Sequence, residues 1–360
     1  MDNDLKKAIV TVTNPFRLYQ AIYLTYLFPE YTWDILHISY LERKTKNSSF
    51  ENICKKANRF NRIFTVSARM HFTTNTELFL QCIKMFIYFI IGKRKDYAKK
   101  IILQSVETFD YDMICVECSY TLVEGALLCF SKEKKVIIME EGMDDYISNE
   151  TQSKLFNGPK SIAAKLLYKM QYINLLYDYH YIPLKYCEKY VRYPELIRAN
   201  HFKNVNKILD FTQIDQTAFI ETIRNSFEIG DELYDVVIYT EPLFCYGLER
   251  EYTKFIQYIK DTFINKKILV KRHPRDSFKY NFGTLDVAER YFEIPGEMIL
   301  QQWKKAVHVF TFPSTILLGI GLENINYKVI KFTSPNQSYN FIFDDLLNFF
   351  KIPSINIVKI

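Results

Sequence analysis

Residues 267–275 read Lys-Ile-Leu-Val-Lys-Arg-His-Pro-Arg, a short apolar run that ends in a basic turn. An uninterrupted apolar run of this length is typical of a strand buried on both faces of a parallel sheet. Pro274 fixes the turn that follows His273. The basic turn is therefore expected at the carboxyl end of a parallel strand, where sheets of this class bind ligands.

Strand-like and helix-like segments alternate on both sides of this turn. Strands are expected at 8–12, 33–39, 111–117, 135–139, 235–239, 267–271, 306–310 and 328–331, and helices at 16–27, 75–91, 121–131, 162–181, 249–265 and 298–305. This alternation predicts an α/β protein with parallel sheets and right-handed crossovers. A break near 225–232 divides it into two Rossmann-like domains facing across a cleft, residues 1–228 and 229–360.

The composition is that of a globular protein with two full cores: 360 residues, 48% apolar and 24% charged. A net charge of +6 without a recognisable nucleic-acid module argues against a nucleic-acid partner. Basic residues gather at 93–95 and 99–100, directly after the apolar run Met85–Ile91. These clusters are either a solvated face or a surface that attracts anionic lipid or an anionic glycan. The apolar run is too short to span a bilayer, so any contact with the inner membrane is expected to be peripheral.

Seven scattered cysteines and no secretion signal predict reduced thiols and a cytoplasmic location, possible also at the inner face of the membrane. No set of His, Asp and Cys residues has metal-ligand spacing, so neither a metal nor a cofactor is expected. His37 and His308 lie in apolar strand-like runs and are expected in the core.

Two adjacent carboxylates, Glu140 and Glu141, follow the strand at 135–139 and precede Gly142. Neighbouring residues at a strand end face opposite sides, so one can face the cleft while the other supports it. A carboxylate at the cleft can take the proton of an attacking hydroxyl. The alternative is a pair of solvated glutamates before a turn.

His273 and Arg275 suit a phosphate leaving group, because guanidinium grips phosphate bidentately and a protonated imidazole can donate a proton to it. Ser314 and Thr315 stand between a strand and a helix, where hydroxyls and free amides form an anion site, although an ordinary helix cap has the same residues. Glu297, before another helix, either holds ribose hydroxyls or simply complements the helix dipole. A proton-accepting carboxylate and a phosphate-holding site together indicate a transferase that uses an activated phosphate donor.

These motifs, in this order, resemble those of bacterial lipooligosaccharide and capsule sialyltransferases. The resemblance rests on Glu140-Glu141-Gly142, His273-Pro274 and Ser314-Thr315, with 11–15 (Thr-Val-Thr-Asn-Pro) similar to the family's start. It is greatest to glycosyltransferase family 52, with bacterial polysialyltransferases as near relatives.

The resemblance implies a GT-B fold, CMP-sialic acid as donor, no metal, and transfer with inversion to a hydroxyl of a cell-surface glycan. It implies Glu141, or else Glu140, as the base and His273 as the residue at the CMP phosphate. Ser314 and Thr315 match phosphate contacts, with Arg275 beside them, and Glu297 looks like the ribose carboxylate. Some members place an acidic residue after the first strand of the second domain, which makes Glu241 an alternative base.

Two other interpretations stay open at this point. A CDP-polyol phosphotransferase of the teichoic-acid type also combines a GT-B scaffold with a His-Pro motif, but commonly relies on two catalytic histidines. A non-catalytic nucleotide- or glycan-binding protein would bind CMP without turnover.

Overall fold

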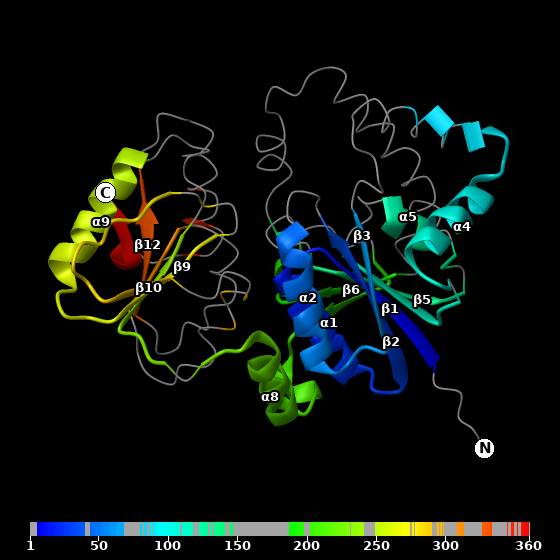
Figure 1. Cartoon of the computed structure of the whole chain (residues 1–360), viewed down its shortest axis with the longest axis horizontal. Helices are drawn as coiled ribbons and strands as arrows, with labels where there is room; N and C mark the ends of the chain where they lie inside the picture. Colours follow the sequence, from blue (N-terminus) through cyan, green and yellow to red (C-terminus); the bar gives the residue numbers. More distant parts are fainter. Residues whose placement is uncertain are drawn as a thin grey trace. The chain divides into compact units, whose positions relative to one another are not determined.

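The computed structural model describes residues 6–39, 44–67, 80, 83–84, 87–88, 90–108, 110–117, 122–128, 130–131, 133–140, 145–146, 187–197, 202–230, 232–240, 249–273, 276, 278–289, 294, 296, 298, 308–312, 326–332, 344, 347–348, 351 and 354–359. The chain divides into two compact units, one of residues 1–141 with 159–228 and one of 142–158 with 229–360. Each unit contains a parallel sheet with helices (Figure 1). The predicted α/β class is confirmed.

The first unit is built on a seven-stranded sheet with the order β3-β2-β1-β4-β5-β6-β7, in which every pairing is parallel. Its strands are β1 (Lys6–Val12), β2 (Tyr31–Ser39), β3 (Arg62–Ser67), β4 (Met113–Val116), β5 (Lys135–Met139), β6 (Glu188–Val191) and β7 (Asn204–Lys207). Its helices are α1 (Pro15–Leu27), α2 (Lys44–Ala57), α4 (Arg94–Ser105), α5 (Leu122–Leu128) and α8 (Gln216–Phe227). Because all strands run the same way, their carboxyl ends lie along one edge.

The core of this unit follows from the apolar strands. One hydrophobic cluster joins Ile9, Leu36 and Ile114 of the sheet to Ala98 and Ile102 of α4 and to residues of α5. Residues on the other face of β1, such as Ala8 and Val10, are equally buried. The central strands are thus buried on both faces, as their uninterrupted apolar sequences predict.

The turn from β1 into α1 is specified by residues within the turn itself. The Asn14 side chain caps α1 by accepting a hydrogen bond from the Arg17 backbone N–H at 3.1 Å. Pro15 occupies the first helical turn, where a missing N–H has no cost. The strand expected at 8–12 and the helix expected at 16–27 are confirmed as β1 and α1, and the helix begins one residue earlier, at Pro15.

The second unit repeats this plan with a six-stranded parallel sheet in the order β10-β9-β8-β11-β12-β13. Its strands are β8 (Val236–Tyr239), β9 (Ile268–Lys271), β10 (Val287–Glu289), β11 (His308–Thr311), β12 (Asn326–Lys331) and β13 (Ile357–Lys359), and its longest described helix is α9 (Glu249–Thr262). In each sheet the order reverses beside the first strand, between β1 and β4 and between β8 and β11. Such switch points are where open α/β sheets bind ligands.

Several elements depart from the sequence expectation. The polar helices α2, α4 and α8 and the short strands β3, β6, β7, β10 and β13 were not predicted. The expected helices at 162–181 and 298–305 lie wholly or mostly outside the described residues. His37 is buried on β2, as predicted, but His308 is exposed at the start of β11, so its expected place in the core is wrong. Within the described part of the chain, no helix is both long and apolar enough to cross a membrane.

Candidate active site

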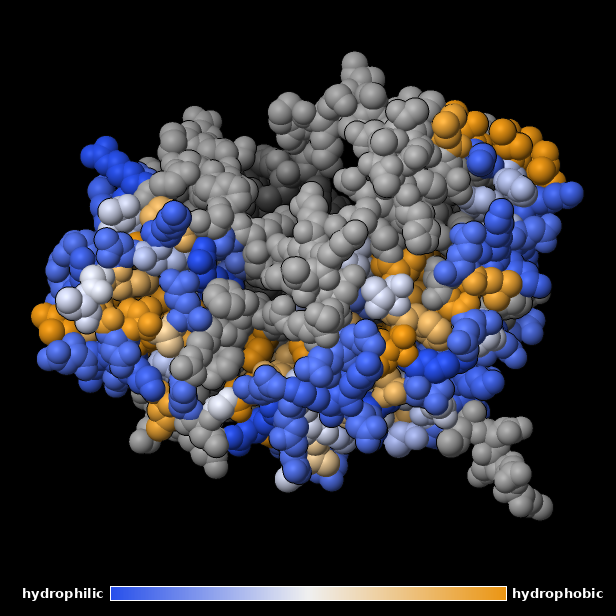
Figure 2. Space-filling view, in the orientation of Figure 1, coloured by the Kyte–Doolittle hydropathy of each residue, from blue (hydrophilic) through white to orange (hydrophobic). Residues whose placement is uncertain are grey.

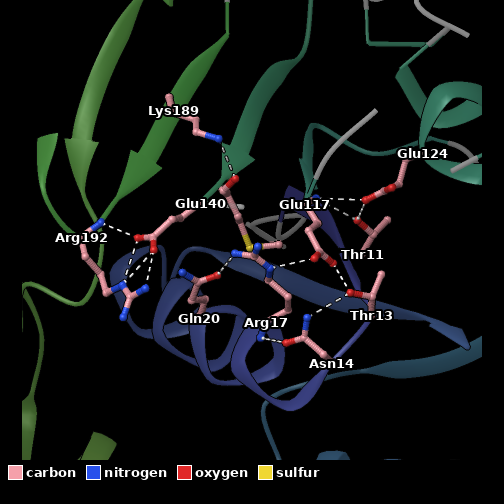
Figure 3. Close-up of polar contacts among 11 residues, drawn as sticks. Thr11, Thr13, Asn14, Arg17, Gln20, Glu117, Glu124, Glu140, Lys189 and Arg192 are labelled. Carbon is pink, nitrogen blue, oxygen red and sulfur yellow. Dashed lines mark hydrogen bonds and ion pairs between the residues drawn. The ribbon is translucent and has the colours of Figure 1, made fainter. Parts of the chain in front are cut away.

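Glu140 lies at the carboxyl end of β5 and is fully buried against Arg192, which follows β6 (Figure 3). The Arg192 guanidinium donates to Glu140 Oε1 from Nε at 2.9 Å and from Nη2 at 2.6 Å. The Arg192 backbone N–H donates to Glu140 Oε2 at 2.8 Å. Both carboxylate oxygens are therefore occupied, and the salt bridge joins the ends of two neighbouring strands.

Two further contacts hold the same corner. Lys189 Nζ donates to the carbonyl oxygen of Met139 at 3.0 Å, and the Arg192 guanidinium lies 4.6 Å from the centre of the Phe16 ring on α1. These contacts tie the Met139 carbonyl to β6 and the Arg192 side chain to α1. Glu141 itself lies outside the described residues. The described contacts of Glu140 are to Arg192.

A second carboxylate, Glu117, lies at the switch point between β1 and β4. Its Oε1 is 2.9 Å from Nε of Arg17, and its Oε2 accepts a hydrogen bond from the Thr13 hydroxyl. The side chains are largely buried, with 3% of Arg17 and 12% of Glu117 exposed. This pair ties the turn before α1 to the end of β4, and Figure 3 shows it at the same edge as Glu140.

Glu124 on α5 contacts both the end of β1 and the backbone of Glu117. Its Oε1 accepts hydrogen bonds from the Thr11 hydroxyl at 2.6 Å and from the Glu117 backbone N–H at 3.0 Å. Neither Glu117 nor Glu124 is among the predicted site residues, because 111–117 is expected as one strand that includes Glu117 and 121–131 as a helix that includes Glu124. The position of Glu117 at a strand end was the available signal, the same signal that identified Glu140.

In the second unit, His273 follows β9 and is held by the end of β8. Its backbone N–H donates to the Thr240 hydroxyl oxygen at 2.9 Å, and its carbonyl accepts from the Asp276 N–H at 2.9 Å. The Thr240 hydroxyl in turn donates to the Asp276 carboxylate. Thr240, His273 and Asp276 therefore form a hydrogen-bonded ring at the carboxyl ends of two adjacent strands.

Arg272 holds this loop in place. Its Nη2 donates to the carbonyls of Asp276 at 2.7 Å and Phe278 at 2.8 Å, and its Nη1 reaches Glu289 at 3.3 Å. The Tyr280 hydroxyl donates to the Asp276 carboxylate, and burial, followed by this hydrogen bond, raises the pKa of Tyr280. The Arg272 guanidinium is thus occupied by contacts within the turn.

Six of the predicted site residues cannot be placed: Glu141, Glu241, Arg275, Glu297, Ser314 and Thr315 lie outside the described residues. Glu141 directly follows Glu140 in the first unit, and described neighbours of Glu241, Glu297, Ser314 and Thr315 lie at the ends of β8 and β11, on either side of the switch point of the second sheet. The Tyr239 hydroxyl, at the end of β8, donates to the carbonyl of Gly296 at 2.9 Å. Thr311 ends β11, the strand that leads to Ser314 and Thr315. Among the residues that the structure describes, no three His, Cys, Asp or Glu side chains gather as a metal site would require.

Comparison with solved structures finds similar chains at low identity. The alpha/beta-galactoside alpha-2,3-sialyltransferase of Photobacterium phosphoreum is 9% identical with a TM-score of 0.47, covering 98% of this chain and 97% of that one. Arabidopsis thaliana UGT89C1 complexed with UDP-L-rhamnose is 11% identical with a TM-score of 0.48, covering 99% and 86%. Acinetobacter baumannii MurG is 10% identical with a TM-score of 0.42, covering 98% and 86%.

A search of curated proteins found no significant match. The family model for alpha-2,8-polysialyltransferase (POLYST), in contrast, matches residues 8–318, which include every motif discussed above. The resemblance to bacterial sialyltransferases is thereby confirmed, and it is the polysialyltransferase branch whose model matches. The phosphotransferase and the non-catalytic binding protein find no support. This chain therefore belongs to the alpha-2,8-polysialyltransferase family and is a sialyltransferase that uses a nucleotide-sugar donor and a glycan acceptor.

Proposed function

We propose that the protein transfers sialic acid from CMP-sialic acid to a hydroxyl of a cell-surface glycan, with a sialic acid already on a capsule or lipooligosaccharide chain as the preferred acceptor. The observation that carries this proposal is the family match over residues 8–318. It is supported by two hydrogen-bonded strand ends, one at Glu140 and one at His273.

The proposed reaction is a direct displacement with inversion. The bond from the anomeric carbon to the CMP phosphate breaks as the acceptor oxygen attacks, and the sugar passes through an oxocarbenium-like state. His273 donates a proton to the departing phosphate oxygen or stabilises its charge, helped by Arg275, Ser314 and Thr315. Glu297 holds the ribose. Cations and hydroxyls stabilise the leaving group in this scheme, so we propose that no metal or cofactor takes part.

Glu141 takes the proton of the attacking hydroxyl in this proposal, and Glu241 is the alternative base. The buried Glu140–Arg192 pair supports the choice of Glu141 over Glu140, because both carboxylate oxygens of Glu140 already accept hydrogen bonds from Arg192. Residues 1–228 would then serve the acceptor and residues 229–360 the donor nucleotide. Reaction in the cytoplasm is supported by the free thiols of Cys54, Cys115 and Cys187.

The test incubates purified full-length protein with CMP-sialic acid and a panel of lactosyl, sialyl-lactosyl and oligosialyl acceptors. Release of CMP together with extension of a sialylated acceptor is the expected result, and it should persist in a chelator. A parallel assay uses CDP-glycerol as donor. Release of CMP from CDP-glycerol but not from CMP-sialic acid would support the phosphotransferase, and CMP binding without turnover would support the binding protein. Activity lost in the chelator and restored by Mg²⁺ would refute the metal-free scheme.

A further inference from the structure

An exposed apolar face stands on the first unit, just before α4. Leu80, Ile87, Ile90 and Ile91 are 53%, 49%, 65% and 56% exposed. Their spacing places them on one face of a helix, since helical residues three, four and seven positions apart share a face. In Figure 2 a run of hydrophobic surface lies at the upper right edge of the molecule, bordered by hydrophilic residues.

The backbone holds this face in a defined shape. The Ile91 N–H donates to the Ile87 carbonyl at 3.0 Å, and the Lys93 N–H donates to the Tyr88 carbonyl at 2.9 Å. Gly92, between them, has φ +70°, the left-handed conformation that ends a helix in this hydrogen-bond pattern. α4 starts two residues later, at Arg94, and is anchored through buried Ala98 and Ile102. The exposed isoleucines therefore belong to a fixed helical corner.

Positive charge surrounds the same corner. Lys84, Lys93, Lys95, Lys99 and Lys100 are all exposed. Between positions 80 and 100 of the sequence, Asp96 is the single acidic residue. Long lysine side chains can keep their ammonium groups at the height of lipid headgroups while the neighbouring aliphatic side chains enter the acyl boundary.

We propose that this interfacial patch, made of the four apolar and five lysine side chains named above, binds the surface of an anionic lipid bilayer. An anionic glycan would account for the lysines but leave four aliphatic side chains in water. A second copy of the chain would bring like charges face to face across a symmetric interface. A bilayer with anionic headgroups satisfies both parts of the patch, with the apolar face in the interface and the lysines at the phosphates.

The experiment measures co-sedimentation of the full-length protein with vesicles of phosphatidylcholine alone and of phosphatidylcholine with phosphatidylglycerol. Binding to the anionic vesicles should exceed binding to the neutral ones and weaken as salt is raised. The variant I87D/I90D should bind at least about tenfold more weakly, since two aliphatic side chains no longer enter the interface. I264D is the matched control: Ile264, in the second unit, is 64% exposed. It should bind like wild type.

A second variant separates the two parts of the patch. K93Q/K95Q keeps the isoleucines and three of the five lysines, so its preference for anionic vesicles should be weaker than that of wild type. Sialyl transfer to a soluble oligosaccharide, measured for every variant, should be unchanged, which shows that the variants fold and keeps this proposal distinct from the proposed function. Equal loss in I264D, or no binding to anionic vesicles, would overturn it. Two other results for the patch variants would also overturn it. One is altered self-association in sedimentation velocity, which would indicate a second copy of the chain. The other is loss of binding to soluble polysialic acid while vesicle binding stays intact, which would indicate a glycan.

Discussion

Glu140 and Arg192, 52 positions apart in the sequence, form a buried two-pronged salt bridge that joins the carboxyl ends of β5 and β6. Neither side chain has more than 7% of its surface exposed. An ion pair this deeply buried is costly to break, because removing one partner leaves the other charge without compensation. The residue expected to act as the base, Glu141, directly follows this bridge.

Arg192→Met is expected to lower the free energy of unfolding by about 3–5 kcal/mol, since Glu140 would be left buried and unpaired. Denaturant unfolding of the purified variant measures this. The double variant E140L/R192M should recover most of the loss, because it removes both charges. A double variant as unstable as R192M would show that the bridge itself does not account for the loss.

Glu141→Gln should lower transfer by something on the order of 10²–10⁴-fold while the affinity for CMP-sialic acid stays close to wild type, because a base acts on the acceptor. Glu140→Gln should mainly affect stability or KM. Donor affinity and single-turnover transfer rates distinguish the two. If both variants transfer normally and Glu241→Gln does not, the base belongs to the second unit.

His273→Ala should lower kcat by roughly 10²-fold or more, because it removes the group that protonates or stabilises the leaving phosphate. His308→Ala is the matched control, an exposed histidine of the same unit at the amino end of β11. Its kcat should be unchanged. Near-wild-type turnover by H273A in a steady-state CMP-release assay would remove His273 from the mechanism.

Glu117→Gln should lower the free energy of unfolding by about 3–5 kcal/mol, since Arg17 would lose its carboxylate in a largely buried place. Glu51→Gln is the control, because the Glu51–Lys55 pair is 48% and 65% exposed and should contribute less than about 1 kcal/mol. Thermal or denaturant unfolding compares the two. Equal effects would mean that the Arg17–Glu117 bridge is no stronger than a surface pair.

Protonation of His37 is expected to lower the free energy of unfolding in acid. His37 stacks on Phe50 with ring centres 3.8 Å apart, and burial lowers its pKa from 6.5 to about 4. The unfolded state therefore binds more protons between these values, so the contribution of His37 is complete above pH 6.5 and falls as pH drops toward 4. The slope from this one group is about 1.4 kcal/mol per pH unit.

Denaturant midpoints of wild type and His37→Phe at pH 5 and pH 7 check this prediction. The phenylalanine keeps the stacking and cannot take a proton, so the variant should lose less stability than wild type between pH 7 and pH 5. An identical pH dependence in both proteins would contradict the assignment to His37.

The sequence alone determined the elements whose stability is local or fully apolar. The runs in β1, β5 and β9 are buried on both faces, so their hydrophobicity marks them without any knowledge of neighbours. Asn14 and Pro15 specify a helix start through contacts within one turn. The polar turns at Glu140 and His273 were found because a parallel strand must end where its apolar run ends.

The tertiary structure decided what depends on distant partners. β6 and β7 contain Glu188, Lys189, Asn204 and Asn206, and they become strands because the ladder beside β5 pairs their backbones. Whether Glu140 is free or bound depends on Arg192, and whether Glu117 is part of a strand or of the site depends on Arg17 and Thr13. Such pairings join residues that only the folded chain brings together, so neither spacing nor local pattern could reveal them.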